Sequence, residues 1–284
     1  MDKKIILVTG ASSGIGACTA KTLADKGHKI ILHGRDEVKT KKVADDIMKE
    51  NSSADIDVIT ADLSLISEVA SFTDKITAKY AHLDVLINNA GAQFTNDREV
   101  TSEGHEKTIA INTLAPFLIT NRLLPLLKKS KEGRVVTVSS ASYSAGGDFD
   151  PEDIEFEKNY SLFRSYGLTK RYVYWVMLKY HQLDRDGITF NCVEPGSAMT
   201  GLARNSAKML WYKILGIMWI PMMWSIDKAA ATSIYMATSD EVKGISGEFY
   251  GKCQKHEIKD KFRVQSEIDC IWDYCNKVCA EYLI

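Results

Sequence analysis

The sequence has no excess of charge of either sign, because 36 basic residues are balanced by 37 acidic ones. Such a balance gives no global field that would gather nucleic acid, and we expect no nucleic-acid partner. The six cysteines form no CxxC pair and fit reduced thiols better than a disulfide framework. Cys275 and Cys279 share an expected helix face, but the sequence offers no further metal ligands beside them. We therefore expect helix packing there and no metal site.

Long apolar segments are also scarce. The N-terminus lacks the apolar segment and cleavage site of a secretory signal, so we expect a cytoplasmic protein. Residues 209–224 are nearly all apolar or aromatic, yet the run is shorter than the roughly 20 residues of a spanning helix. We interpret it as part of a lid over an apolar substrate pocket, at about residues 197–225. A buried core helix and peripheral docking on a membrane surface are the alternatives.

Short apolar runs alternate with amphipathic stretches through most of the chain, which is typical of βα units on a parallel sheet. We predict a single-domain Rossmann fold over residues 1–284, with a doubly wound, mainly parallel seven-stranded sheet and helices on both faces. Residues 141–160, rich in glycine and acidic residues, interrupt this pattern and predict a surface insertion. The expected strands are Ile5–Thr9, Lys29–His33, Asp57–Thr60, Val85–Asn88, Arg134–Ser139, Thr189–Val193 and Glu248–Tyr250.

A glycine-rich turn follows the first expected strand and opens a helix. In TGASSGIG, Gly10, Gly14 and Gly16 would let the backbone turn tightly and approach a pyrophosphate, whose charge the helix start favours. An ordinary tight turn is the alternative, which the position of the motif disfavours. Ser12, Ser13 and Ile15 belong to the same expected dinucleotide contact.

The end of the second strand favours NADP over NAD. A NAD site usually places an acidic residue there for the ribose hydroxyls, whereas this chain has Arg35. A guanidinium suits a 2′-phosphate, and Lys39 one helical turn later adds a second positive charge. Asp36 could still serve a ribose, so NAD remains the less favoured cofactor.

Two further strand ends are expected to face the cofactor. Asp62 and Leu63 follow the third strand, where a carboxylate or neighbouring amides can meet the adenine edge, although Asp62 could instead cap a helix. The fourth strand ends in NNAG, whose small residues would keep the cofactor side of the sheet open. Asn89, Ala90 and Gly91 therefore join the expected binding residues.

Tyr166 and Lys170 lie four positions apart at the start of a long helical pattern, so both side chains project to one face. A phenol with a pKa of about 10 is a poor base at neutral pH, but a nearby ammonium lowers that pKa. Tyr166 would then donate a proton to a carbonyl or accept one from an alcohol. Both residues would also contact the cofactor.

Two more polar positions complete the candidate site. Ser139 and Ser140 end the fifth strand, and strand alternation allows only one of them to hold a substrate oxygen. Asn112 lies in a helical stretch that Pro116 is expected to kink. Asn112 would help to order a water that links Lys170 to solvent, or would satisfy the broken helix.

Together these segments resemble the short-chain dehydrogenase/reductase family over almost the whole chain. The resemblance implies that the second serine of VSS is the catalytic one. It also implies that four residues line the cofactor, with Thr200 near the nicotinamide amide: Asn89, Pro195, Gly196 and Thr200. The implied catalytic residues are Asn112, Ser140, Tyr166 and Lys170.

The spacing from Ser140 to Tyr166, the apolar run after PGSAMT and the tail ISGEFYGK resemble the retinol dehydrogenase and WW-domain oxidoreductase branch. That resemblance implies an NADP-dependent enzyme that interconverts a lipophilic alcohol and its aldehyde or ketone. It also implies a homodimer through the helices that contain Asn112 and Tyr166. A cofactor-binding sensor or scaffold with little turnover is the alternative function.

Overall fold

The computed structural model describes residues 2–184, 186–196 and 225–284. In this part of the chain, one eight-stranded sheet has the order β3-β2-β1-β4-β5-β6-β7-β8. Strands β1 to β7 are parallel, which confirms the predicted doubly wound architecture. The strands are β1 (Ile5–Val8), β2 (Lys29–Gly34), β3 (Asp55–Thr60), β4 (Val85–Asn88), β5 (Arg134–Val138), β6 (Thr189–Glu194), β7 (Phe249–Gly251) and β8 (Gln254–Lys255).

The eighth strand was not predicted. β8 pairs antiparallel with β7 through a two-residue turn. Both turn residues, Lys252 and Cys253, have positive φ angles of 54° and 57°. This is the backbone of a type I′ hairpin, which usually carries Asn-Gly or Asp-Gly. Neither signal is present in Lys252-Cys253, and a strand of two residues shows no periodicity, so β8 could not be predicted from the sequence.

The order of the strands creates the place where a ligand can bind. The chain runs outward from β1 to β2 and β3, then crosses back to β4 on the other side of β1. Connections from β1 and β4 therefore leave in opposite directions, and a crevice opens beyond their carboxyl ends. The segments that follow these two strands begin at Thr9 and Asn89.

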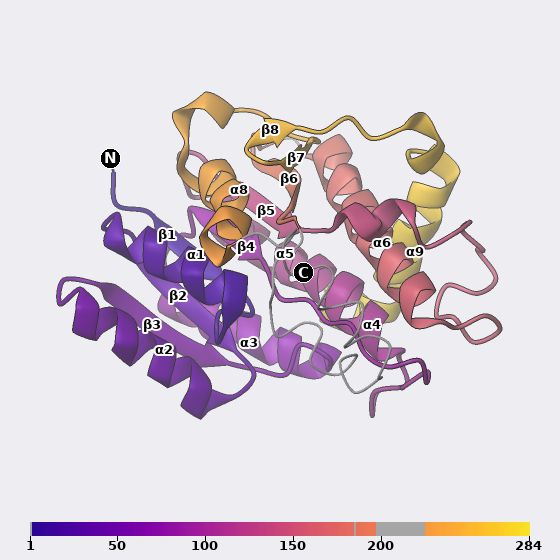
Figure 1. Cartoon of the computed structure of the whole chain (residues 1–284), viewed down its shortest axis with the longest axis horizontal. Helices are drawn as coiled ribbons and strands as arrows, with labels where there is room; N and C mark the ends of the chain where they lie inside the picture. Colours follow the sequence, from indigo (N-terminus) through magenta and orange to yellow (C-terminus); the bar gives the residue numbers. More distant parts are fainter. Residues whose placement is uncertain (1, 185, 197–224) are drawn as a thin grey trace.

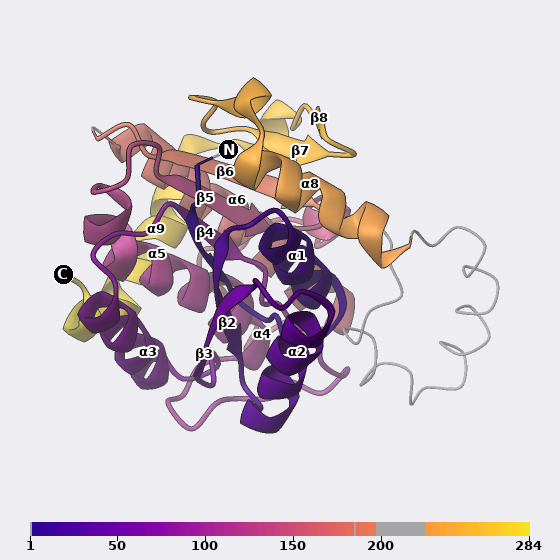
Figure 2. The same ribbon diagram turned by 90° about the vertical axis from the view of Figure 1, so that its left-hand side faces the viewer.

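Helices cover both faces of the sheet (Figure 2). Side chains alternate along β1, so Ile6 and Val8 pack with the first layer and Leu7 with the second. The first layer is α1 (Gly14–Asp25), α2 (Glu37–Glu50) and α8 (Ile226–Thr238). The second is α3 (Ile66–Lys79), α5 (Ala115–Leu127) and α6 (Leu162–Leu183), over which α9 (Gln265–Cys279) lies. Short turns complete the described chain: α4 (Lys107–Ile109), η1 (Ala110–Leu114), η2 (Ala141–Ser144), η6 (Asp240–Val242), η7 (Asp260–Phe262) and η8 (Ala280–Tyr282).

The irregularity expected at Pro116 takes the form of a wide turn. η1 is a π-helical turn that ends just before α5, and Pro116 occupies the first turn of α5. Proline is tolerated there because the π-helical turn directly before it already interrupts the regular α-helical hydrogen-bond pattern. Asn112 lies in the middle of this π-helical turn, a kind of distortion that is frequent at functional sites.

Residues 141–160, the predicted surface insertion, include many exposed residues, but a few of their side chains pack against the core. Phe156 is fully buried and stacks on Tyr172 of α6 with 6.3 Å between ring centroids. Phe149 meets Trp175 edge-to-face at 5.4 Å. The glycines and acidic residues that predicted a surface loop thus alternate with aromatic residues that anchor it to α6.

The C-terminal helix α9 packs on the outer side of α6 (Figure 1, yellow). Trp272 meets Phe117 and Tyr180 edge-to-face at 5.3 and 4.9 Å. The Trp175 indole N–H, from α6, donates to the Phe262 carbonyl at 2.7 Å. Cys275 and Cys279 are free, fully buried thiols, as the helix-packing interpretation expects.

This packing bears on the predicted homodimer. Every residue from Gly167 to Leu178 in α6 is buried within the one chain. A partner subunit could reach this stretch only by displacing α9 or residues 141–160. The homodimer through this helix stays a prediction, and α9 and residues 141–160 contribute to the cover of this part of the helix.

Among the described residues, the stretch Lys107–Leu127 is long and apolar enough to span a membrane, and 72% of its apolar window is buried. It packs between α3 and α6. We interpret it as a core helix of the fold.

Ile271→Ala should lower the free energy of unfolding by about 3 kcal/mol, because it leaves a cavity under α9 at a fully buried position. Asp273→Ala, at an exposed position of the same helix, is the matched control and should change it by less than about 0.5 kcal/mol. Urea denaturation followed by circular dichroism measures both. Equal effects would show that α9 is not part of the cooperative core.

Candidate active site

The glycine-rich turn joins β1 to α1 at the crevice. Gly10 and Gly14 have φ angles of +66° and +56°, a region that other residues rarely adopt. A Cβ on Gly16 would lie 2.4 Å from the Gly10 carbonyl oxygen and 2.5 Å from Nδ2 of Asn89. Two glycines are thus needed for conformation and the third for close approach.

The start of α1 offers donors to an anion. Ser13 occupies the N-cap position, but its side chain accepts no capping hydrogen bond. The first turn of an α-helix has N–H groups without intrahelical partners, and the helix dipole favours negative charge there. Ser12 and Ser13 lead into this first turn and Ile15 lies in it, where the sequence predicted the pyrophosphate contact.

Thr9 connects the ends of β1 and β4 through hydrogen bonds, a role that was not predicted from the sequence. Its hydroxyl accepts hydrogen bonds from the backbone N–H groups of Asn89 and Ala90, both at 3.0 Å. The Asn89 side-chain amide donates in return to the carbonyls of Thr9, at 2.8 Å, and Gly10, at 3.3 Å. NNAG and the glycine-rich turn are therefore one rigid unit, and a polar residue directly before the first glycine was the available signal.

Arg35 and Asp36 differ in what they can offer a ribose or phosphate. Asp36 caps α2 by accepting from the Lys39 N–H at 3.0 Å, and it pairs with the Lys39 ammonium at 2.9 Å. These contacts lower the pKa of Asp36. The Arg35 side chain is 72% exposed. The acidic candidate for a NAD ribose is thus already engaged, and the guanidinium is accessible.

Asp62 does not cap α3, whose N-cap position is Leu65, but its side chain organises the turn that precedes this helix. Its Oδ1 accepts from the Ser64 N–H at 2.9 Å and from the Ser64 hydroxyl at 2.8 Å, which forms a turn ahead of α3. The other oxygen, Oδ2, lies 3.7 Å from the Arg35 guanidinium. Leu63 is buried next to it. Asp62 therefore helps to orient Arg35 at the crevice.

Tyr166 and Lys170 lie on one face of α6, with the Lys170 ammonium 5.9 Å from the centre of the Tyr166 ring. Lys170 is 3% exposed and donates to the Val138 carbonyl at 2.9 Å. Burial lowers the pKa of Lys170 to about 8. The pKa of Tyr166 is raised by burial, opposed by a hydrogen bond with Ser140, so the predicted lowering by Lys170 was wrong for this arrangement. Desolvation by burial is the largest effect on the pKa of the phenol.

The two serines at the end of β5 face different partners. The Ser139 hydroxyl is buried and donates to the Lys170 carbonyl at 2.7 Å, which ties the strand to α6. Ser140 lies beside Tyr166 and accepts from the Ser142 N–H at 3.2 Å as the N-cap of η2. Its hydroxyl also shares a hydrogen bond with that of Ser142 at 2.9 Å. Only Ser140 is placed to hold a substrate oxygen next to the phenol.

The Asn112 side chain forms hydrogen bonds with the backbone of a neighbouring segment. Its Oδ1 accepts from the Ala92 N–H at 2.9 Å, and its Nδ2 donates to the Ala92 carbonyl at 3.0 Å and to the Thr169 hydroxyl at 3.1 Å. Both amide protons are therefore engaged, so a water relay would have to use the Asn112 backbone carbonyl. Pro116, four positions later, has no N–H to offer that carbonyl.

Gly91 is the point where these residues converge. A Cβ at Gly91 would lie 2.9 Å from the Lys170 ammonium and 3.3 Å from Oδ1 of Asn112. The last residue of NNAG thus touches both groups, which come from η1 and α6. The structure brings together Asn112, Ser140, Tyr166, Lys170 and the glycine-rich turn at one edge of the sheet.

Two of the remaining predicted residues follow β6 at the same edge. Pro195 and Gly196 continue directly from the strand, and Gly196 has a φ of +72°. Residues 197–224 lie outside the described residues. They include Thr200, the apolar run at 209–224 and nearly all of the lid predicted at about 197–225.

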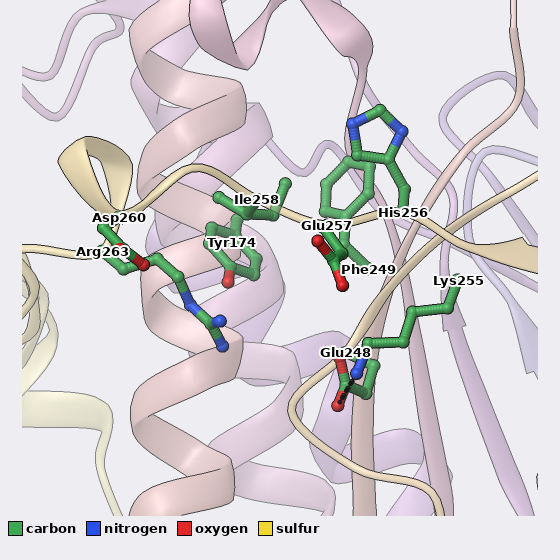
Figure 3. A pocket seen from close by; sticks show the side chains of 9 residues that line it. All are labelled: Tyr174, Glu248, Phe249, Lys255, His256, Glu257, Ile258, Asp260 and Arg263. Atoms are coloured by element: carbon green, nitrogen blue, oxygen red, sulfur yellow. Dashed lines mark hydrogen bonds and ion pairs between the residues drawn. The ribbon is translucent and has the colours of Figure 1, made fainter.

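A cavity of about 190 Å³ lies elsewhere, at the β7–β8 edge (Figure 3). Its wall includes Tyr174, Arg263 and the ion pair between Lys255 and Glu248 at 2.8 Å. None of the predicted site residues that the structure describes lines it. Because its charges have both signs, we assign it no ligand.

Comparison with known proteins agrees with this geometry. The family model for short chain dehydrogenases matches residues 4–150. Human retinol dehydrogenase 14 is 32% identical over 96% of this chain and 85% of its own length. Human polyprenol dehydrogenase is 34% identical over 87% of this chain and 76% of its own length.

Solved structures agree as well. A short chain dehydrogenase from Escherichia coli CFT073, complexed with NADPH, superposes with a TM-score of 0.70 at 25% identity, over 89% of this chain and 98% of its own. Levodione reductase has the same fold, with a TM-score of 0.72 over 87% of this chain and 95% of its own, at 20% identity. With the glycine-rich turn, the Tyr166–Lys170 pair and the strand-end serine at one sheet edge, these matches show that the chain is an oxidoreductase of the short-chain dehydrogenase family.

Proposed function

We propose that this chain interconverts a lipophilic alcohol and its aldehyde or ketone with NADP(H), with Tyr166 as the acid or base. The observation that carries the proposal is the convergence of Ser140, Tyr166 and Lys170 beside the glycine-rich turn. The glycine-rich turn and the free N–H groups at the start of α1 fit a pyrophosphate. When bound there, the nicotinamide supplies or accepts the hydride.

The proton steps belong to the chain itself. Ser140 holds the substrate oxygen with its hydroxyl, and Tyr166 donates a proton to that oxygen during reduction or removes it during oxidation. Burial of Tyr166 keeps its phenol protonated at neutral pH, which suits a proton donor. Lys170, whose pKa is about 8, can exchange a proton near neutral pH and so resupply the phenol. Asn112 keeps Gly91 and Ala92 in place beside Lys170.

The preference for NADP rests on the residues that directly follow β2. Asp36 is engaged as a helix cap, whereas Arg35 presents a guanidinium that Asp62 orients. A 2′-phosphate would receive a charge-assisted contact from Arg35. The NADPH-bound relative of known structure supports the same cofactor class.

The proposed substrate class rests on relatives. Retinol and polyprenol, in the names of two relatives, are both lipophilic alcohols. The apolar run at 209–224 and its contact with substrate or a membrane surface stay predictions, as does a cytoplasmic location.

The direct test combines cofactor binding with turnover. NADPH should raise the melting temperature more than NADH does, and retinal or another lipophilic aldehyde should cause loss of the reduced-nicotinamide absorbance. Stabilisation by NADPH without turnover on a broad panel of aldehydes, ketones and alcohols would favour the sensor or scaffold function instead. Absence of any stabilisation would refute the dinucleotide site.

Tyr166→Phe should reduce kcat by about 100-fold or more, because general acid catalysis contributes roughly that much. The Kd for NADPH should stay within about threefold, because only the hydroxyl is removed. Tyr172→Phe is the control on the same helix. Its buried hydroxyl has no hydrogen-bond partner among the described residues, so its removal should leave kcat unchanged. Full activity in Tyr166→Phe would contradict the assigned role.

Arg35→Ala should raise the KM for NADPH by about 10-fold or more and that for NADH by less than about threefold, because a charge-assisted hydrogen bond contributes roughly 1.5–3 kcal/mol. Lys41→Ala is the control, since Lys41 lies on α2, which begins shortly after Arg35, and pairs with Glu37. Steady-state kinetics with both cofactors measures the ratio. A parallel change for NADPH and NADH would refute the 2′-phosphate contact.

A further inference from the structure

His33, the fifth residue of β2, is a buried histidine that plays no part in the proposed chemistry. Its side chain is 2% exposed. The ring packs against Phe72 of α3, with 4.7 Å between centroids and an angle of 58° between planes. A buried polar ring of this kind is stable only when its nitrogens are satisfied. The partners of those nitrogens therefore matter.

Both ring nitrogens have backbone partners, which lie in the segments that follow β1 and β3. Nδ1 accepts from the Gly10 N–H at 3.2 Å, in the glycine-rich turn. Nε2 lies 3.2 Å from the Ala61 carbonyl, directly after β3. Because Gly10 can only donate and Ala61 can only accept, the neutral imidazole must carry its proton on Nε2. The two contacts thus fix one tautomer.

The backbone of the same strand end locks onto the same turn. The His33 carbonyl accepts from the Ala11 N–H at 2.7 Å. A Cβ on Gly34 would lie 2.9 Å from the Cβ of Ser12. These backbone contacts survive any substitution at His33. The side chain adds the hydrogen bond from the N–H of Gly10, the first glycine of the turn.

We propose that His33 is a positioning residue for the cofactor, whose imidazole fixes the Gly10 peptide and thereby holds the glycine-rich turn in its binding conformation. This inference rests on the proposed function. Gly10, at a φ of +66°, has little steric restraint of its own, so a hydrogen bond to its N–H restricts the directions that its peptide group can take. His33 acts from behind the turn, since its burial keeps it from touching a ligand.

Burial also keeps this arrangement constant near neutral pH. Desolvation lowers the pKa of His33 to about 4, opposed by the hydrogen bond to Ala61 and the charge of Asp62. The ring is therefore neutral, and Nδ1 remains an acceptor. A protonated ring would place a second N–H against the Gly10 N–H.

Two substitutions separate the two hydrogen bonds. The side-chain oxygen of Asn in His33→Asn reaches about the position of Nδ1 and can accept from Gly10. The longer amide of Gln in His33→Gln reaches about the position of Nε2 and can donate to Ala61. Each variant loses the ring and one contact, so both should show a similar fall in melting temperature. They are each other's control for packing.

We expect His33→Asn to keep the Kd for NADPH within about threefold of the unsubstituted protein, and His33→Gln to raise it by about 10-fold. The kcat at saturating NADPH should be unchanged in both, because His33 does not contact Ser140, Tyr166 or Lys170. An unchanged Kd in His33→Gln, or an equal loss in both variants, would overturn the proposal and leave His33 a packing residue.

Two measurements without cofactor separate this inference from the proposed function. Amide hydrogen exchange at Gly10 should be faster in His33→Gln and not in His33→Asn. In the unsubstituted protein, ¹⁵N shifts of the His33 ring at neutral pH should show the proton on Nε2, and a proton on Nδ1 would refute the contact even if neither variant folds. Failure of the unsubstituted protein to bind NADPH would refute the proposed function, while the exchange rates would still decide whether His33 holds the turn.

Discussion

The close approach of the segments that follow β1 and β4 is the constraint on which the site depends. Thr9 and Asn89 exchange hydrogen bonds across this gap, and Gly16 and Gly91 leave no room for a side chain. Because parallel strands carry their connections to the same edge, these contacts place a dinucleotide turn and a lysine-bearing helix side by side. The glycines thus serve both conformation and close approach, because a Cβ at Gly16 would press on the Gly10 carbonyl and the Asn89 side chain, and one at Gly91 would displace the Lys170 ammonium.

The second determinant is the burial of α6. The sheet covers one side of this helix, and α9 with residues 141–160 covers the other. This burial explains both pKa shifts at the site, since desolvation disfavours the charged forms of Tyr166 and Lys170. A protonated phenol and a lysine that can lose its proton near neutral pH are suited to passing a proton along one helix face. The packing that covers α6 is therefore also the cause of the pKa shifts of Tyr166 and Lys170.

The hydrogen bonds of the predicted site residues show that these residues have different roles. Asn112 holds the backbone of Ala92, Asp62 organises the turn before α3 and faces Arg35, and Ser139 ties β5 to α6. Such residues shape the site through their neighbours, whereas Ser140 and Tyr166 present their hydroxyls to one another. His33 belongs with the first group, because its ring joins the glycine-rich turn to the end of β3. Most of these residues were predicted from the sequence. The sequence did not distinguish the residues that position their neighbours from those that present a hydroxyl group at the site.

The sequence by itself determined the seven parallel strands, the glycine-rich turn and the spacing of Tyr166 and Lys170, because these depend on local periodicity and on residues close together in the chain. It did not indicate β8, whose turn lacks the usual hairpin residues, or the packing of residues 141–160, whose aromatic anchors lie among loop-forming residues. The pKa direction of Tyr166, the division of labour between Ser139 and Ser140, and the cover of α6 by α9 were decided only by the tertiary structure. Each depends on which distant segment excludes water or supplies a hydrogen-bond partner, and no local pattern carries that information.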